Sequence, residues 1–243
     1  MRLMAPSTAF ASIERRTGSC ANCDLQATCL RPGLSREDGE HLGHLFYTRR
    51  GVKHGEDLYR AGDSYSAIYA IRSGFFKTEF VLRDGHSQVM GFYIPGEVMG
   101  MDGIGTGAYT CNAVALEDAK VCAIPLFRSD MTPNEMRDLA HCVIQIMSKE
   151  LVHDHHVMAV LGGKSADARL AAFLVDLSRR FAARGYVSSD LELPMTREDI
   201  GSFLGLTLET ISRMLSKLQR MKVIEVHRRH IRILHMAGLG QLL

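Results

Sequence analysis

Two short helices joined by a glycine turn constrain the fold of this chain more than any other feature of its sequence. Thr196 lies three positions before an acidic residue, the spacing of a capping box, so a helix is predicted over 197–204. Gly205 supplies a tight turn, and Thr207 caps a second helix that is predicted from 208 to about 220. Two short helices joined in this way form a helix-turn-helix.

The second helix separates its residues onto two faces. A predicted buried stripe has apolar side chains at intervals of three or four positions: Leu208, Ile211, Leu215 and Leu218. Glu209, Ser212 and Arg213 share another face in the first two turns, the part of such motifs that enters the major groove of DNA. An Arg can donate two hydrogen bonds to guanine, a Glu can accept one from cytosine, and a Ser can do either. The alternative is a plain surface ion pair between Glu209 and Arg213.

The residues after the second helix add a basic hairpin. Two apolar runs, 223–226 and 231–234, flank Arg228 and Arg229, so a winged helix-turn-helix is predicted. Residues 165–243 carry 12 Lys and Arg against 8 Asp and Glu, whereas the rest of the chain carries 17 against 19. A basic C-terminal third on a mildly acidic body favours a polyanionic partner, here double-stranded DNA.

A long amphipathic helix is predicted over about 134–161. Its residues at alternating steps of four and three form a coiled-coil seam: Ala140, Ile144, Met147, Leu151, Asp154, Met158 and Leu161. A second stripe, made by Leu139, Val143 and Ile146, can face another part of the same chain. A helix with two apolar stripes favours a homodimer, with a single core helix as the alternative. Gly162 and Gly163 end the helix and provide a hinge.

Asp154 interrupts this seam. In a parallel homodimer its carboxylate faces its own copy, and like charges in a partly dry seam repel each other. Either the register of the helix is wrong or the dimer is marginal at this point.

The region from about 52 to 126 has a different pattern. Short runs rich in β-branched and aromatic residues alternate with Gly-containing turns at intervals of roughly 8–12 residues, which is typical of a jelly roll or barrel. Together with the helices, this predicts an α+β fold: a β-roll, a long helix and a winged helix-turn-helix.

Three cysteines, Cys20, Cys23 and Cys29, have the spacing C-x2-C-x5-C. No run of about 18 apolar residues and no secretory signal are visible, so we expect a cytoplasmic chain without a membrane partner. In a reducing compartment, such a cysteine cluster favours metal or redox chemistry over disulfides. No Ser/His/Asp arrangement, P-loop or paired carboxylates stand out, so an enzyme is not expected.

The chain as a whole resembles the fumarate and nitrate reduction regulator subgroup of the cyclic-AMP receptor protein superfamily. The resemblance extends from Cys20 onward, and its strongest segments are 169–173, 177–181 and 195–215, the last including Glu209 through Arg213. It implies four regions: an N-terminal arm with cluster-binding cysteines (1–33), a β-roll of the cyclic-nucleotide-binding type (34–132), a dimerisation helix with its hinge (133–163), and a DNA-binding domain (164–243).

The resemblance also implies the chemistry. Members hold an oxygen-labile [4Fe–4S] cluster on residues that correspond to Cys20, Cys23, Cys29 and Cys122, and the cluster promotes dimerisation. Glu209, Ser212 and Arg213 match the motif that reads palindromic sites with TTGAT half-sites. Members activate or repress transcription in the absence of oxygen. The turns around Ser73 and around 84–86 are candidate contacts with RNA polymerase, with plain hairpin tips as the alternative.

Several alternatives remain open for the cysteines and for a metal. On a DNA-binding regulator of the same fold, four thiolates can also bind zinc, or the cysteines can act as a thiol redox switch. Cys111 is a competitor of Cys122 as the fourth ligand, whereas Cys142 is expected to be a small buried hydrophobic residue. His153 and His156 lie one helical turn apart and form either a metal site or a solvated helix face.

The sequence departs from the subgroup next to the cluster cysteines and from the superfamily at the cyclic-nucleotide site. Asp24 and Thr28, next to the cysteines, are polar where the subgroup has a small neutral and an apolar residue, so oxygen sensitivity is expected to differ. Residues 108–112 contain no Arg to pair with a phosphate, although the turn Gly96-Glu97 is present, so no cyclic nucleotide is expected.

Overall fold

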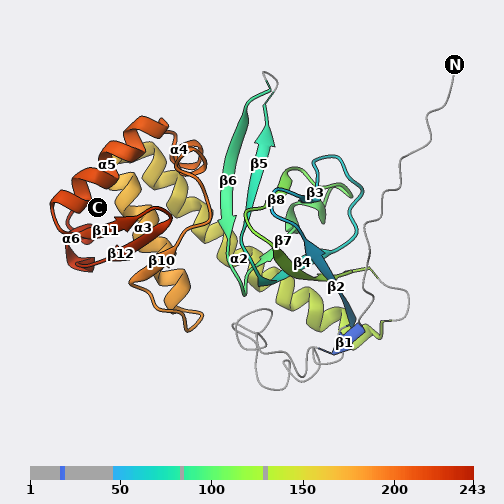
Figure 1. Ribbon diagram of the computed structural model, residues 1–243. Helices are drawn as coiled ribbons and strands as arrows, with labels where there is room; N and C mark the ends of the chain where they lie inside the picture. Colours follow the sequence, from blue (N-terminus) through green and yellow to red (C-terminus); the bar gives the residue numbers. More distant parts are fainter. Residues whose placement is uncertain (1–16, 20–45, 83–84, 128–130) are drawn as a thin grey trace, which may run out of the picture.

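The computed structural model describes residues 17–19, 46–82, 85–127 and 131–243. It contains a β-roll, one long helix and a helical domain that ends in a small sheet, an α+β fold as predicted (Figure 1). Cys20, Cys23 and Cys29 lie outside the described residues. Among the described residues, no helix is long and apolar enough to cross a membrane.

The roll consists of two antiparallel sheets. The first has the strand order β1 (Thr17–Ser19), β2 (Phe46–Val52), β9 (Ala119–Ile124), β4 (Ile68–Ser73) and β7 (Val98–Met99). The second has the order β3 (Asp57–Tyr59), β8 (Asn112–Ala115), β5 (Phe76–Val81) and β6 (Ser87–Tyr93). A short 3-10 helix, η3, spans Met101–Gly103. The turn between β4 and β5 needs Gly74, because its φ is 83° and a Cβ there would lie 2.5 Å from the Cβ of Ala119.

The interior of the roll is filled by aromatic rings. Tyr59 and Tyr109 stack with ring centroids 4.0 Å apart, and Tyr69 lies next to both. The hydroxyl of Tyr109 donates a hydrogen bond to the carbonyl of Ala67 at 2.7 Å. These contacts form a packed core between the two sheets.

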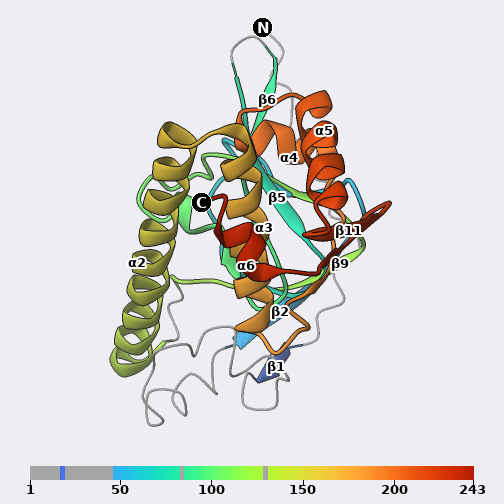
Figure 2. The ribbon, with the colours of Figure 1, turned by 90° about the vertical axis from the view of Figure 1, so that its left-hand side faces the viewer.

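Helix α2 spans Pro133–Gly163. Thr132 and Glu135 form a capping box at its start, and Lys164 leaves the helix in an extended conformation directly after the predicted glycine pair. Leu139 and Val143 are buried against the roll and Ile146 packs partly buried beside them, so the second predicted stripe of this helix is confirmed. In Figure 2, α2 lies at the edge of the molecule, with most of the described chain on one side of it.

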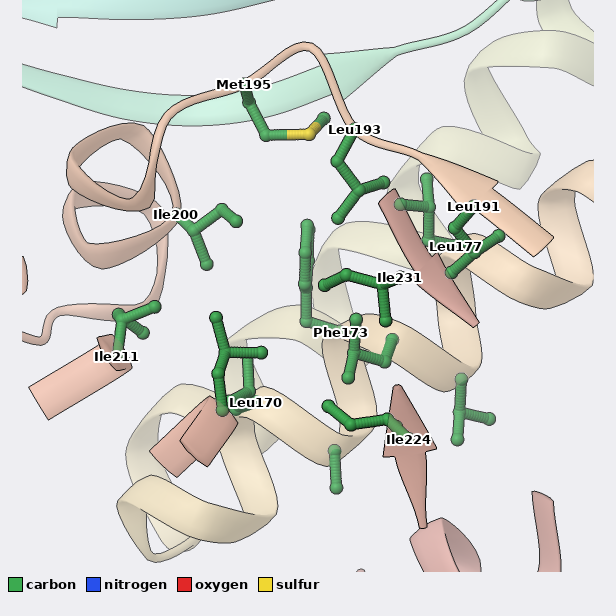
Figure 3. Close-up of a cluster of buried hydrophobic side chains, with 14 of the residues drawn as sticks. Leu170, Phe173, Leu177, Leu191, Leu193, Met195, Ile200, Ile211, Ile224 and Ile231 are labelled. Atoms are coloured by element: carbon green, nitrogen blue, oxygen red, sulfur yellow. The ribbon is translucent and has the colours of Figure 1, made fainter. Parts of the chain in front are cut away.

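The C-terminal domain is a winged helix-turn-helix. Its elements are α3 (Ala166–Ala182), β10 (Asp190–Glu192), α4 (Arg197–Leu204), α5 (Leu208–Arg220), β11 (Ile224–His227), β12 (His230–Ile233) and α6 (Met236–Gly240). Strand β10 pairs with β12 and gives the wing a third strand. Figure 3 shows how Leu170, Phe173 and Leu177 of α3 meet side chains from the strands and from the other helices.

One short strand comes from the predicted N-terminal arm. Residues 17–19 form the edge strand β1, which pairs with β2 in the register Thr17 with Thr48. Backbone pairing rather than an amphipathic pattern places this segment, so three residues without periodicity gave no signal.

Candidate DNA-binding surface, helix stripe and cysteine site

The two helices of the helix-turn-helix are capped as the sequence predicts. The Oγ1 of Thr196 accepts a hydrogen bond from the amide of Asp199 at 3.0 Å, and an Asp199 oxygen accepts the amide of Thr196 at 2.8 Å. The Oγ1 of Thr207 accepts the amide of Thr210 at 3.2 Å, and Gly205 has the left-handed φ of 64° that ends α4. These local hydrogen bonds fix where both helices begin.

The buried face of α5 differs in one position from the prediction. Ile211, Leu215 and Leu218 are buried as expected, but Leu208 is 45% exposed and Met214 is 4% exposed. The shared core contains Met214 and not Leu208, which is the first residue of the helix.

The three predicted base-reading residues share an accessible face at the start of α5. Glu209 and Arg213 are exposed and Ser212 is half-buried. In the part of the chain that the structure describes, no ion pair joins Glu209 to Arg213, so the alternative of a plain surface ion pair is not seen there. Hydrogen bonds from its own amide and from Thr207 lower the pKa of Glu209, which keeps this acceptor ionised.

The structure adds a residue that the sequence patterns missed. Arg197, the first residue of α4, donates a hydrogen bond from Nη1 to the Oγ of Ser212 at 3.1 Å. The wing carries its basic tip as predicted: Arg228, with a φ of 56°, and Arg229 are both exposed between β11 and β12.

The last six of the seven predicted seam residues of α2 are here called the α2 stripe: Ile144, Met147, Leu151, Asp154, Met158 and Leu161. The four apolar residues from Ile144 to Met158 are 44 to 64% exposed, and Asp154 is exposed between them. Leu161 is half-buried against the core of the DNA-binding domain. A row of large exposed apolar side chains on one helix face is typical of a surface that another protein chain covers.

Cys122 lies on the face of the roll that packs against α2. It is buried in a cluster with Leu139, Cys142 and Val143 of α2. Its neighbour in the chain, Ala123, pairs with Thr48 of β2, which in turn pairs with Thr17 of β1. The segment that leads into Cys20 is therefore attached to the sheet that carries Cys122.

Cys111 is in a different environment from Cys122. It belongs to the aromatic core inside the roll, where its thiol lies 3.6 Å from a carboxylate oxygen of Asp102. Burial and the negative charge of Asp102 raise the pKa of the Cys111 thiol to about 12, so the thiolate that a metal needs is disfavoured there. Burial also raises the pKa of Cys142 to about 11, in keeping with a buried hydrophobic role.

The two histidines of the predicted pair on α2 have different surroundings. His153 lies 3.6 Å from Asp176 of α3, and His156 is exposed. Within the described ranges, no three His, Cys, Asp or Glu side chains are grouped to hold a metal ion.

Comparison with known proteins identifies the family. Residues 168–242 match the Crp-like helix-turn-helix domain, and residues 49–128 match the cyclic nucleotide-binding domain. The chain is 38% identical to the transcriptional activator protein FnrA of Stutzerimonas stutzeri, over 93% of this chain and 92% of the relative. It is 37% identical to the fumarate and nitrate reduction regulatory protein of Escherichia coli K12, over 92% of this chain and 89% of the relative.

A solved structure agrees with these matches. The structure of FixK2 from Bradyrhizobium japonicum aligns with a TM-score of 0.72 and 30% identity, over 81% of this chain and 96% of that one. The relatives are transcriptional regulators and not enzymes. From the two domains and the identity along almost the whole chain, we conclude that the protein belongs to the FNR-type transcriptional regulators of the CRP family.

Proposed function

We propose that this regulator responds to oxygen through a [4Fe–4S] cluster held by Cys20, Cys23, Cys29 and Cys122. With the cluster bound, two copies pair along the α2 stripe and bind palindromic DNA with TTGAT half-sites. Four thiolates are the ligand set of such a cluster, which, when bound, supplies a centre that oxygen degrades. The regulator then activates or represses transcription when oxygen is absent.

The packing of Cys122 against α2 carries this proposal. On one side of α2, Leu139, Cys142 and Val143 belong to the same buried apolar group as Cys122. On the other side, Ile144 and Met147 are exposed. Because protein interiors are close-packed, a change in the position of Cys122 displaces the adjacent turns of α2. The same turns begin the α2 stripe, so the cysteine and the dimer surface are coupled through one helix.

Asp154 makes the dimer conditional. When two α2 helices pair in parallel, the two Asp154 carboxylates come close together and repel each other. The apolar residues of the α2 stripe favour pairing and Asp154 opposes it, so a small change at the roll can decide between monomer and dimer. Monomers lose the fixed spacing of two reading helices, and with it specific binding.

The DNA contacts follow from the accessible face of α5. Arg213 donates to guanine, Glu209 accepts from cytosine and Ser212 contacts a neighbouring base, while Arg228 and Arg229 of the wing contact phosphates. The support for this assignment is the exposure of Glu209 and Arg213 in the N-terminal turns of α5, beside the half-buried Ser212, and the exposure of both wing arginines.

A cyclic nucleotide is not part of the proposal. At residues 108–112, where a phosphate partner is needed, the side chains are Tyr109, which fills the roll, and Thr110, which donates to Asp102. The carboxylate of Asp102 repels a phosphate at this position.

We also propose a cytoplasmic location and contacts with RNA polymerase through the turns at Ser73 and at 84–86, where Ser73, Gly85 and His86 are exposed.

The test is a measurement of iron, acid-labile sulfide and DNA binding on protein purified without oxygen, repeated after exposure to air. The wild type is expected to be coloured and to bind a TTGAT palindrome before air and not after it. Cys122→Ser is expected to lose iron and DNA binding together. Cys111→Ser is the matched control, because it also changes a buried roll cysteine but keeps the proposed ligands.

Two outcomes contradict the proposal. A colourless preparation that contains zinc assigns the cysteines to a different metal. A preparation without iron that binds the palindrome equally well before and after air leaves only a transcription factor of this fold.

A further inference from the structure

Glu97 of the roll is buried and is held by two arginines of the DNA-binding domain. It lies in the turn before β7 and is 8% exposed. Arg180 of α3 donates from Nε and Nη2 to its two carboxylate oxygens at 2.9 and 2.6 Å. Arg184, one turn further on, lies 2.9 Å from the same carboxylate. The amide of Ile94 donates the fourth contact at 2.8 Å.

This charge cluster has little freedom to rearrange. Arg180 also donates to the carbonyl of Phe92 at 2.5 Å, so its guanidinium is hydrogen-bonded to two residues of the roll, Glu97 and Phe92. Burial alone would raise the pKa of Glu97, but the guanidinium groups of Arg180 and Arg184 lower it below its ordinary value. Removing one member of a buried charge cluster leaves the others desolvated without compensation, which is strongly unfavourable.

A second set of contacts joins the roll to α4. The amide of Val89 on the edge strand β6 donates to the Oγ of Ser202 at 2.9 Å. The ring of Phe92 meets Phe173 of α3 and Phe203 of α4 with centroids 5.8 and 5.4 Å apart. Figure 1 shows α4 beside β6 at the junction of the two domains. The domain that reads DNA is therefore fixed to its own roll through α3 and through α4.

We propose that Glu97 is a positioning residue for DNA binding, which sets the orientation of the helix-turn-helix on the roll through Arg180 and Arg184. The proposal rests on dimeric DNA binding as proposed above, but not on the cluster. In a dimer, the roll and α2 define the symmetry axis, so the angle of α3 on the roll determines the distance between the two α5 helices. A dimer accepts only half-sites at that distance. A rigid Glu97 contact then makes the protein sensitive to the spacer between half-sites.

The experiment compares binding to palindromes whose spacer is the preferred length, or one or two base pairs longer or shorter. In Glu97→Gln, the preference for the best spacer is expected to fall by about tenfold, within the usual range of coupling between two sites. The base preference inside each half-site is expected to stay unchanged, because α5 is intact. Glu97→Asp keeps the charge and is expected to recover part of the spacer preference.

Asp118→Asn is the matched control, since Asp118 is an exposed carboxylate of the same roll whose ion pair, with Lys53, stays within the roll. Hydrogen exchange supplies a readout that needs no DNA: the amides of Val89 and Ile94, which donate to Ser202 and Glu97, are expected to exchange faster in Glu97→Gln. If exchange accelerates but no variant or wild type binds DNA, the proposed function fails and the contact stands. If Glu97→Gln keeps the wild-type spacer preference, or binds every spacer more tightly, the positioning role is overturned.

Discussion

Lys77 of the roll lies 2.9 Å from Asp199, the residue that completes the capping box with Thr196 at the first helix of the helix-turn-helix. Lys77 also lies 3.0 Å from Glu79, and all three side chains are less than 20% exposed. Burial alone would raise the pKa of Asp199, but the ammonium of Lys77 and the hydrogen bonds from Thr196 lower it. One carboxylate thus serves both as a helix cap and as the partner of a cation in the other domain.

Lys77→Met is expected to lower the free energy of unfolding by about 2 kcal/mol, because it leaves two half-buried carboxylates without their cation. The depressed pKa of Asp199 contributes stability above its unfolded value near pH 4, and this contribution is lost as the pH falls through the lower, folded value. The difference between wild type and variant should therefore shrink below about pH 4. Urea unfolding at several pH values measures it.

Lys53→Met is the control for that series. Lys53 and Asp118 form an ion pair at 2.7 Å, but their side chains are 81% and 64% exposed. An exposed pair contributes roughly 0 to 1 kcal/mol, so little change is expected. Equal losses in the two variants would show that the Lys77 contact between the domains has no special weight.

Asp154→Ala is expected to give a dimer that persists in air, because it removes two like charges from the α2 stripe and leaves its apolar residues in place. Sedimentation velocity on aerated protein measures the monomer and dimer fractions. Arg137→Ala changes an exposed charge on the same helix outside the stripe and should stay monomeric in air. An aerated Asp154→Ala variant that remains monomeric would contradict this account of the switch.

Local sequence signals predicted much of this fold. They did not predict contacts between segments that are far apart in the sequence. Thr196, Gly205 and Thr207 act on residues within a few positions, so the two helices were predictable to the residue. Glu97 was visible only as part of a turn, because its arginine partners lie 83 residues or more further along the chain. No periodicity in the sequence reports such a contact.

The same limit applies to the candidate site. The exposed face of α5 follows from helical periodicity, whereas the Arg197 contact to Ser212 depends on the angle between two helices. The sequence placed Cys111 and Cys122 on the same roll, but their separation into two different buried groups depends on how the two sheets pair.

Gly201→Ala is expected to destabilise the DNA-binding domain and weaken DNA binding. A Cβ at Gly201 would lie 2.6 Å from the carbonyl oxygen of Leu206, which is backbone and cannot rotate away. Overpacking of this kind costs about 1 to 3 kcal/mol and would push α5 away from α4. Gly240→Ala, where nothing lies within 4 Å of the added atom, is the control. Thermal unfolding and a DNA gel shift are the measurements, and equal behaviour of the two variants would contradict the prediction.

Glu150→Gln is expected to change how stability depends on pH. Burial and the charge of Glu97 raise the pKa of Glu150 to about 7, despite the opposing charge of Arg180. A carboxyl group with a raised folded pKa contributes stability below its unfolded pKa, near 4.5, and loses that contribution as the pH rises through about 7. The glutamine does not titrate. Between pH 5 and pH 8, the free energy of unfolding of the variant should therefore rise relative to that of the wild type by about 1 to 3 kcal/mol. Urea unfolding of the aerated wild type and variant at each pH gives the free energy of unfolding of both as a function of pH. The contributions of the other titrating groups cancel when one curve is subtracted from the other. Parallel curves across this range would show that Glu150 ionises in the folded chain as freely as in water.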